Sequence, residues 1–167
     1  MRKQQQANML TPYVLARDHS QMVRTPDGAT MFVYATGAQT GNTVAVVEFI
    51  FPPGGGFPMH IHHNEDEALY ILEGTLLVVC GETRSEAGPG TFIYGPRNIP
   101  HGYRVLGDVP VRFVESFLPS GLEQFFLTIG KPITGQTGQE VKEVFKPSMK
   151  ALLAEKYHVD IVGPIPQ

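Results

Sequence analysis

The chain has 167 residues, which is enough for one domain that buries a core without disulfides. Its formal net charge is −3 and its Lys and Arg residues are scattered, which argues against nucleic acid or anionic lipid as a partner. Cys80 is the single cysteine, so the chain can form neither an internal disulfide nor a site with several thiolates.

The first expected element is a poorly ordered N-terminal arm at residues 1–12. It begins MRKQQQANML, which is rich in glutamine rather than apolar residues and so differs from a secretory signal. No later apolar run has the length of a membrane span. We therefore expect no membrane partner and a cytoplasmic location.

Short strands separated by turns are expected to fill residues 13–119. The chain holds 18 Gly and 14 Pro with only 17% charged residues, a balance typical of many turns that join short strands. Polar turn segments separate stretches that are rich in β-branched and aromatic residues. The expected strands are MFVYA, TVAVVEFIF, EALYIL, TLLVVC, TFIYG, GYRVL and VRFVESFL. This pattern predicts a small, antiparallel, all-β barrel.

The pattern changes to helical spacing in the remainder of the chain, residues 120–167. Three segments carry this spacing, and Pro147 suits the first turn of the last one. The segments are GLEQFFLTI, QEVKEVF and PSMKALLAEKY, followed by VGPIPQ as a non-helical end. The extension is too short for a separate domain, so we expect it to pack on the barrel or on a neighbouring subunit.

One stretch of the barrel, MHIHHNEDEALYILEG at residues 59–74, combines histidines and acids with an apolar, strand-like run. His60 and His62 are two residues apart at the end of an expected strand, so both side chains lie on one face and His63 lies on the other. Glu67 opens the next strand and shares its face with Leu69 and Ile71. A carboxylate at the start of one strand can therefore meet two imidazoles at the end of its neighbour.

His101 is the fourth candidate ligand, and it follows the stiff segment PRNIP at the start of a later strand. Its expected inward set is His101, Tyr103 and Val105. Three imidazoles and one carboxylate suit a divalent transition metal (iron, manganese, nickel, cobalt, copper or zinc) better than calcium or magnesium. With four protein ligands, an octahedral metal keeps two positions for water, dioxygen or substrate.

These residues carry a resemblance to the cupin superfamily. Residues 54–74 match the first cupin motif, with His60, His62 and Glu67 in the ligand positions. The second motif begins at Gly90 and places its histidine at His101. Asn98 stands where a glycine is usual, and Val105 where an asparagine is usual. The resemblance covers residues 44–118 and implies a cupin barrel, that is, a jelly roll or double-stranded β-helix. The helical spacing of the later segments adds short C-terminal helices to this barrel.

A second likeness begins where the barrel is expected to end. The segment FLPSGLEQFFLTIGKP resembles the one that follows the core in small bacterial cupins similar to quercetinases, the flavonol 2,4-dioxygenases. This resemblance implies a metal-dependent oxygenase that acts with dioxygen on a small organic, flavonol-like substrate. It also implies that Glu67 is both metal ligand and general base.

Two other functions are compatible with the same residues. A metal-assisted isomerase or another proton-transfer enzyme needs the same base and metal but no dioxygen, so oxygen consumption separates it from an oxygenase. The third reading is a non-catalytic cupin that binds a small ligand. For each of the three we expect a homodimer, because small cupins of this kind usually pair and open sheet edges need covering.

Other conspicuous residues have more ordinary explanations. Acidic and basic residues on a connection are usually solvated or lie outside direct metal coordination, and strand aromatics usually belong to the core. Neighbouring phenylalanines on a helix usually pack against the body of the protein. This applies to His63, Glu65 and Asp66 on the connection, to Tyr70 and Tyr103 in strands, and to Phe125 and Phe126 in the helical segment.

Overall fold

The computed structural model describes residues 10–133 and 146–166, and strands make up most of this part. Three helices longer than a single 3-10 turn accompany them: α1 (Gly37–Thr40), α2 (Glu123–Ile129) and α3 (Pro147–Tyr157). The strands are β1 (Gln21–Arg24), β2 (Thr30–Ala35), β3 (Ala45–Phe51), β4 (Gly56–His62), β5 (Asp66–Glu73), β6 (Thr75–Cys80), β7 (Thr83–Ala87), β8 (Phe92–Gly95), β9 (His101–Leu106), β10 (Val111–Leu118), β11 (Lys131–Pro132) and β12 (Val159–Gly163).

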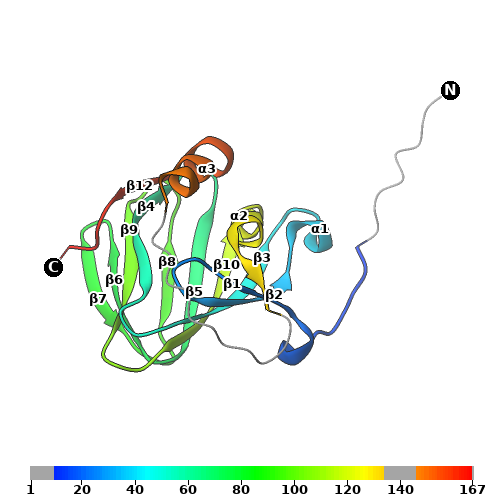
Figure 1. The fold of residues 1–167 in the computed structure, drawn as a ribbon, viewed down its shortest axis with the longest axis horizontal. Coiled ribbons are helices and arrows are strands. Elements are labelled where there is room, and N and C mark those ends of the chain that lie inside the picture. Colours follow the sequence, from blue (N-terminus) through cyan, green and yellow to red (C-terminus); the bar gives the residue numbers. More distant parts are fainter. Residues whose placement is uncertain (1–9, 134–145, 167) are drawn as a thin grey trace.

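The strands form two sheets that face each other (Figure 1). One sheet has the order β11-β1-β2-β3-β10-β5-β8, and the other has the order β12-β4-β9-β6-β7. The pairings within both sheets are antiparallel, and several neighbours in a sheet are distant in the sequence. This is the jelly-roll arrangement that the cupin resemblance implied, and the predicted fold class is confirmed.

Each of the seven strands predicted by strand composition is present. The sequence did not predict β7, because TRSEA lies in a segment that is polar enough to be a turn. Nor did it predict the strands β1, β11 and β12. The last of these pairs with β4, so the end of the chain belongs to a sheet as well as to helices. The expected helix QEVKEVF and most of the expected arm, residues 1–12, lie outside the described residues.

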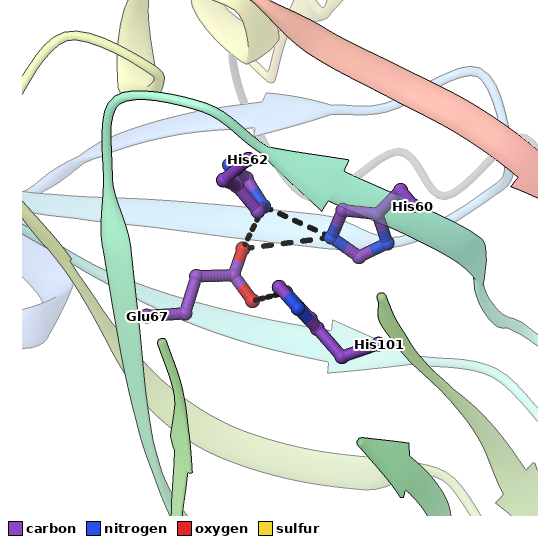
Figure 2. Close-up of side chains that lie close together, drawn as sticks. All are labelled: His60, His62, Glu67 and His101. Carbon is purple, nitrogen blue, oxygen red and sulfur yellow. Dashed lines mark hydrogen bonds and ion pairs between the residues drawn. The ribbon is translucent and has the colours of Figure 1, made fainter. Parts of the chain in front are cut away.

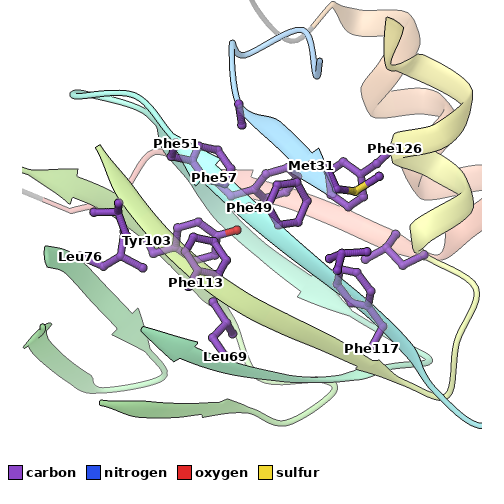
Figure 3. Close-up of a cluster of buried hydrophobic side chains, with 14 of the residues drawn as sticks. Met31, Phe49, Phe51, Phe57, Leu69, Leu76, Tyr103, Phe113, Phe117 and Phe126 are labelled. Atoms are coloured by element: carbon purple, nitrogen blue, oxygen red, sulfur yellow. The ribbon is translucent and has the colours of Figure 1, made fainter. Parts of the chain in front are cut away.

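Aromatic side chains fill the space between the sheets (Figure 3). Alternation along β3 and β10 points Phe49, Phe51 and Phe113 inward, and each is at most 1% exposed. The rings of Phe51 and Phe113 stack with their centroids 5.8 Å apart. Burial of each such side chain contributes about 1.5–3 kcal/mol before its entropy cost. This core holds the two sheets at a fixed separation.

Helices α2 and α3 lie on the same side of the barrel (Figure 1). Phe125 and Phe126 on α2 are buried, and the ring of Phe125 meets that of Tyr157 on α3 edge to face at 5.6 Å. The expectation that these phenylalanines pack against the body is confirmed. None of the helices in the described part of the chain is long and apolar enough to cross a membrane.

Candidate metal centre

The four predicted ligands come together between the two sheets (Figure 2). His60 and His62 lie on β4 and His101 on β9 of one sheet, while Glu67 lies on β5 of the facing sheet. One candidate ligand atom from each residue lies within 4.8 Å of the others, and the four side chains are buried. All four side chains therefore point inward, as the alternation along their strands predicted.

The ligand atoms are separated by distances that suit a shared metal ion. His60 Nε2 lies 2.9 Å from His62 Nε2, and His62 Nε2 lies 2.8 Å from Glu67 Oε1. His101 Nε2 lies 3.1 Å from the other oxygen, Glu67 Oε2. Donor atoms that each lie about 2.0–2.2 Å from one transition metal are about 3 Å apart when adjacent. The donor set fits a divalent transition metal both in chemistry and in spacing.

Backbone carbonyl groups orient two of the imidazole rings. The Nδ1–H of His60 donates to the carbonyl oxygen of Pro58 at 2.8 Å, and the Nδ1–H of His101 donates to that of Ile99 at 2.8 Å. Because a neutral imidazole carries one N–H, these bonds assign the proton to Nδ1 and leave a lone pair on Nε2. Both rings therefore present an unprotonated nitrogen to the centre of the cluster.

Two backbone features hold the histidine strands in register. Gly56 begins β4 with φ +145° opposite Arg104 of β9, and a Cβ there would collide with the backbone of β9. The turn before β9 is attached to β4 by the N–H of Asn98, which donates to the carbonyl oxygen of His62 at 2.7 Å. Asn98 has φ +64°, a conformation that favours glycine and tolerates asparagine, so its occurrence at a usual glycine position keeps the turn intact.

The electrostatics of the metal-free cluster favour one ionised carboxylate beside one protonated imidazole. Burial opposes the charge of Glu67, but the charge of His62 and the hydrogen bond from its ring hold the pKa of Glu67 well below its usual range. Burial also opposes the charge of His62, yet Glu67 and Glu65 together raise the pKa of His62 to about 9. For His60 burial dominates and lowers the pKa.

A small cavity adjoins Glu67 and His101 inside the barrel. Its volume is about 10 Å³, which is room for about one water molecule. Apart from Glu67, His101 and the Cys80 thiol, its walls are mainly apolar: Leu69, Val78, Ile93, Gly95, Gly102 and Tyr103. The Cys80 side chain is half-buried and borders this cavity.

The remaining charged residues of the motif have separate environments. His63 points outward, as alternation predicted, and its ring nitrogens lie 3.2 Å from Asn98 Oδ1 and 2.9 Å from Asp160 Oδ2. Asp66 forms a two-pronged ion pair with Arg97 at 3.0 Å. Glu65, in contrast, is only 5% exposed and lies beside His62. Of the three residues expected to be solvated or outside direct metal coordination, His63 and Asp66 thus lie at the surface, whereas Glu65 is buried.

Sequence reasoning overlooked a second buried carboxyl group, that of Glu115. This residue lies on β10, is 1% exposed, and shares the inward face with Phe113 and Phe117. Burial, followed by the charge and hydrogen bonding of Glu67, raises the pKa of Glu115 well above its usual range. Its buried surroundings therefore favour the protonated form of Glu115. The alternation of VRFVESFL carried this signal, because Glu115 is in phase with two phenylalanines.

Comparison with known proteins gives matches to the barrel. Residues 47–117 match the family model for the cupin domain. The quercetin 2,3-dioxygenase of Bacillus subtilis (strain 168) is 31% identical over 124 residues, which cover 74% of this chain and 36% of that protein. An uncharacterised protein of Methanocaldococcus jannaschii is 33% identical over 70 residues, which cover 42% of this chain and 56% of that protein. The chain thus spans about one third and about half of the lengths of these relatives.

Solved structures with lower sequence identity share the fold. An RmlC-like cupin from Shewanella frigidimarina has a TM-score of 0.58 and 14% identity, covering 70% of this chain and 99% of that one. A predicted oxalate decarboxylase from Thermotoga maritima has a TM-score of 0.60 and 16% identity, covering 64% of this chain and 99% of that one. At these identities the likeness concerns the fold alone.

Proposed function

Because the chain belongs to the cupin superfamily, we propose that it is a metal-dependent oxygenase that acts on a small organic substrate with dioxygen. His60, His62, Glu67 and His101 would bind one divalent transition metal. The likeness to a protein named quercetin 2,3-dioxygenase supports the choice of reaction, and the buried donor set supports the choice of cofactor.

The observation that carries the proposal is the convergence of three imidazoles on one ionised carboxylate in a buried space. A bound metal would supply a Lewis acid that makes a substrate hydroxyl more acidic. Glu67 is ionised and lies at the wall of the cavity, so it would accept the hydroxyl proton as general base. The apolar walls around it would exclude bulk water from this proton transfer.

The cavity size bears on the substrate class. A space of about 10 Å³ beside Glu67 holds about one water-sized molecule. A flavonol can therefore enter only if neighbouring side chains move, whereas a small diol requires less displacement. We accordingly place small hydroxylated molecules first among substrates and treat flavonols as the larger members of the same series.

Oxygen consumption is the direct test. Purified protein would be loaded separately with Fe²⁺, Mn²⁺, Ni²⁺, Co²⁺, Cu²⁺ and Zn²⁺ and supplied with a panel of flavonols and small diols. We expect substrate-dependent oxygen uptake with at least one metal, and none after removal of the metal with a chelator. Substrate turnover without oxygen uptake would contradict the oxygenase, and metal binding without turnover of any compound would indicate a ligand-binding protein.

A further inference from the structure

Each imidazole of the cluster has two ring nitrogens: Nε2 faces the other candidate ligands, and Nδ1 faces away from them. In two of the three rings Nδ1 is hydrogen-bonded to a backbone carbonyl group. His60 and His101 donate Nδ1–H to carbonyl oxygens two residues earlier in the chain. His62 Nδ1 is buried and has no hydrogen-bond partner of normal length among the described residues. The third ring thus needs a different acceptor to define its tautomer.

Glu65 provides the nearest acidic group to this nitrogen. Its Oε2 lies 3.7 Å from His62 Nδ1, and it too is buried without a hydrogen-bond partner in the described part of the chain. The distance exceeds an ordinary hydrogen bond by about 0.7 Å. A hydrogen bond between these two buried, unpaired atoms would stabilise the folded state. Without this bond, the hydrogen bonds to water that each atom loses on burial are not replaced.

The surroundings of Glu65 allow this small movement while keeping the side chain near His62. The turn before α2 borders it, since a Cβ on Gly121 would lie 3.8 Å from Glu65 Oε1. A pocket of about 350 Å³ lies beside it, lined by Asn64, Glu65, Gly121, Gln124, Thr128, Lys156 and Tyr157. The C-terminal helices therefore form the outer wall of a space in which the carboxylate can adjust.

The Gly121 turn is itself anchored to the barrel by a buried carboxylate. Glu123 Oε2 accepts the N–H of Gly121 at 2.6 Å, and Glu123 Oε1 accepts the N–H of Gly37 at 2.9 Å. Glu123 is 1% exposed. The wall against Glu65 is thus tied to the loop that begins α1 and is not a loosely attached segment.

We propose that Glu65 is a positioning residue of the metal centre, whose carboxylate accepts the Nδ1–H of His62 and so directs the Nε2 lone pair of that ring to the metal. This inference rests on the proposed metal site. A carboxylate acceptor makes an imidazole a stronger electron donor than a carbonyl acceptor does. The Nε2 of His62 is therefore more basic than that of His60 or His101, whose Nδ1–H groups donate to backbone carbonyl oxygens instead of a carboxylate.

Substitution of Glu65 tests the proposal through metal affinity rather than turnover. Glu65→Leu removes the acceptor at similar size, and Glu65→Gln retains an amide oxygen that can accept Nδ1–H without charge. Loss of such an outer partner typically costs 10- to 100-fold in metal affinity. We expect a loss of about that size for Glu65→Leu and a smaller loss for Glu65→Gln, measured by competition between the protein and a chelator for Zn²⁺.

The matched control is Asp66→Asn, because Asp66 is the adjacent carboxylate but pairs with Arg97 at the surface. It should leave Zn²⁺ affinity unchanged. Nitrogen NMR shifts of the His62 ring provide a second readout that general loosening of the fold would not reproduce. With Zn²⁺ bound, wild-type His62 should be protonated at Nδ1 alone, and in Glu65→Leu the Nδ1 shift of this ring should change while the Nδ1 shifts of His60 and His101 stay the same.

The outcomes separate this inference from the proposed function. Wild-type protein that binds no metal would overturn both. Wild-type protein that binds Zn²⁺, together with a folded Glu65→Leu variant of equal affinity and unchanged His62 shifts, would overturn the role of Glu65 alone. If Glu65→Leu does not fold, the Glu65→Gln variant decides, because equal affinity and unchanged shifts there would also overturn the role.

Discussion

His60 and His62 present their Nε2 atoms to each other at 2.9 Å. His60 Nε2 carries a lone pair, because its Nδ1–H is donated to the carbonyl oxygen of Pro58. The proton between the two rings in the metal-free protein therefore belongs to His62, which also lies 2.8 Å from ionised Glu67. A metal ion would take the place of this proton.

Metal binding should accordingly release about one proton near neutral pH. The pKa of His62 is raised to about 9 in the metal-free protein, so metal and proton compete for Nε2 below that pH. The apparent metal affinity should rise about tenfold per pH unit up to about pH 9 and then level off. Calorimetric titration in buffers of different ionisation enthalpy measures the released proton. A binding enthalpy independent of the buffer would contradict this prediction.

Removal of two ligands should abolish metal binding. In the double variant His62→Ala, His101→Ala only His60 and Glu67 remain of the four candidate donors. We expect about one equivalent of transition metal in unchelated wild-type protein and close to none in the variant, measured by elemental analysis. Circular dichroism checks that the variant retains its strands. Equal metal content in two folded proteins would refute the ligand assignment.

Glu67→Gln should separate metal binding from proton transfer. Glutamine has nearly the size of glutamate and an amide oxygen that can approach a metal, but it cannot accept the substrate proton. Oxygen consumption should fall on the order of a hundredfold or more, since general-base catalysis contributes 10²–10⁴. Metal content should fall much less. Undiminished oxygen consumption at normal metal content would show that the proton goes to another group.

Glu115→Gln should stabilise the protein at neutral pH. Folding raises the pKa of Glu115 because the side chain is buried, so the folded state binds a proton that the unfolded state releases above about pH 4.5. The contribution of this group to the free energy of unfolding therefore decreases as pH rises. Glutamine needs no proton, so we expect a gain on the order of 1–3 kcal/mol at pH 7.

The gain from Glu115→Gln should disappear near pH 4, where Glu115 is protonated in both folded and unfolded states. Urea unfolding of wild type and variant at the two pH values provides the comparison. Glu86→Gln is a suitable control, because Glu86 lies exposed on β7. A variant that is less stable than wild type at pH 7 would show that Glu115 is ionised and paired there.

A homodimer remains a prediction from the sequence. In the described part of the chain, β8 and β7 each end a sheet, and strands at sheet edges leave backbone groups available for pairing. Light scattering at micromolar concentration should give a mass near twice 18.4 kDa. The mass of a monomer under these conditions would contradict the predicted homodimer.

Local sequence pattern was sufficient to identify the candidate ligands. A strand repeats every two residues, so His60 and His62 must share a face, and Glu67 must face inward with Leu69 and Ile71. The spacing of the two motifs then related His101 to the same site. The same periodicity places Glu115 on the inward face of its strand. Its burial was not predicted, because acidic residues usually lie at the surface.

Tertiary structure decided the features that depend on contacts between distant segments. Nothing near Glu65 in the sequence distinguishes it from Asp66, yet one is enclosed by the Gly121 turn and the other pairs with Arg97 at the surface. The strand β12 exists because Val159–Gly163 finds the open edge of β4, a partner about a hundred residues earlier. Burial and strand pairing are set by which surfaces meet, and a one-dimensional pattern specifies only the direction of each side chain from its own backbone.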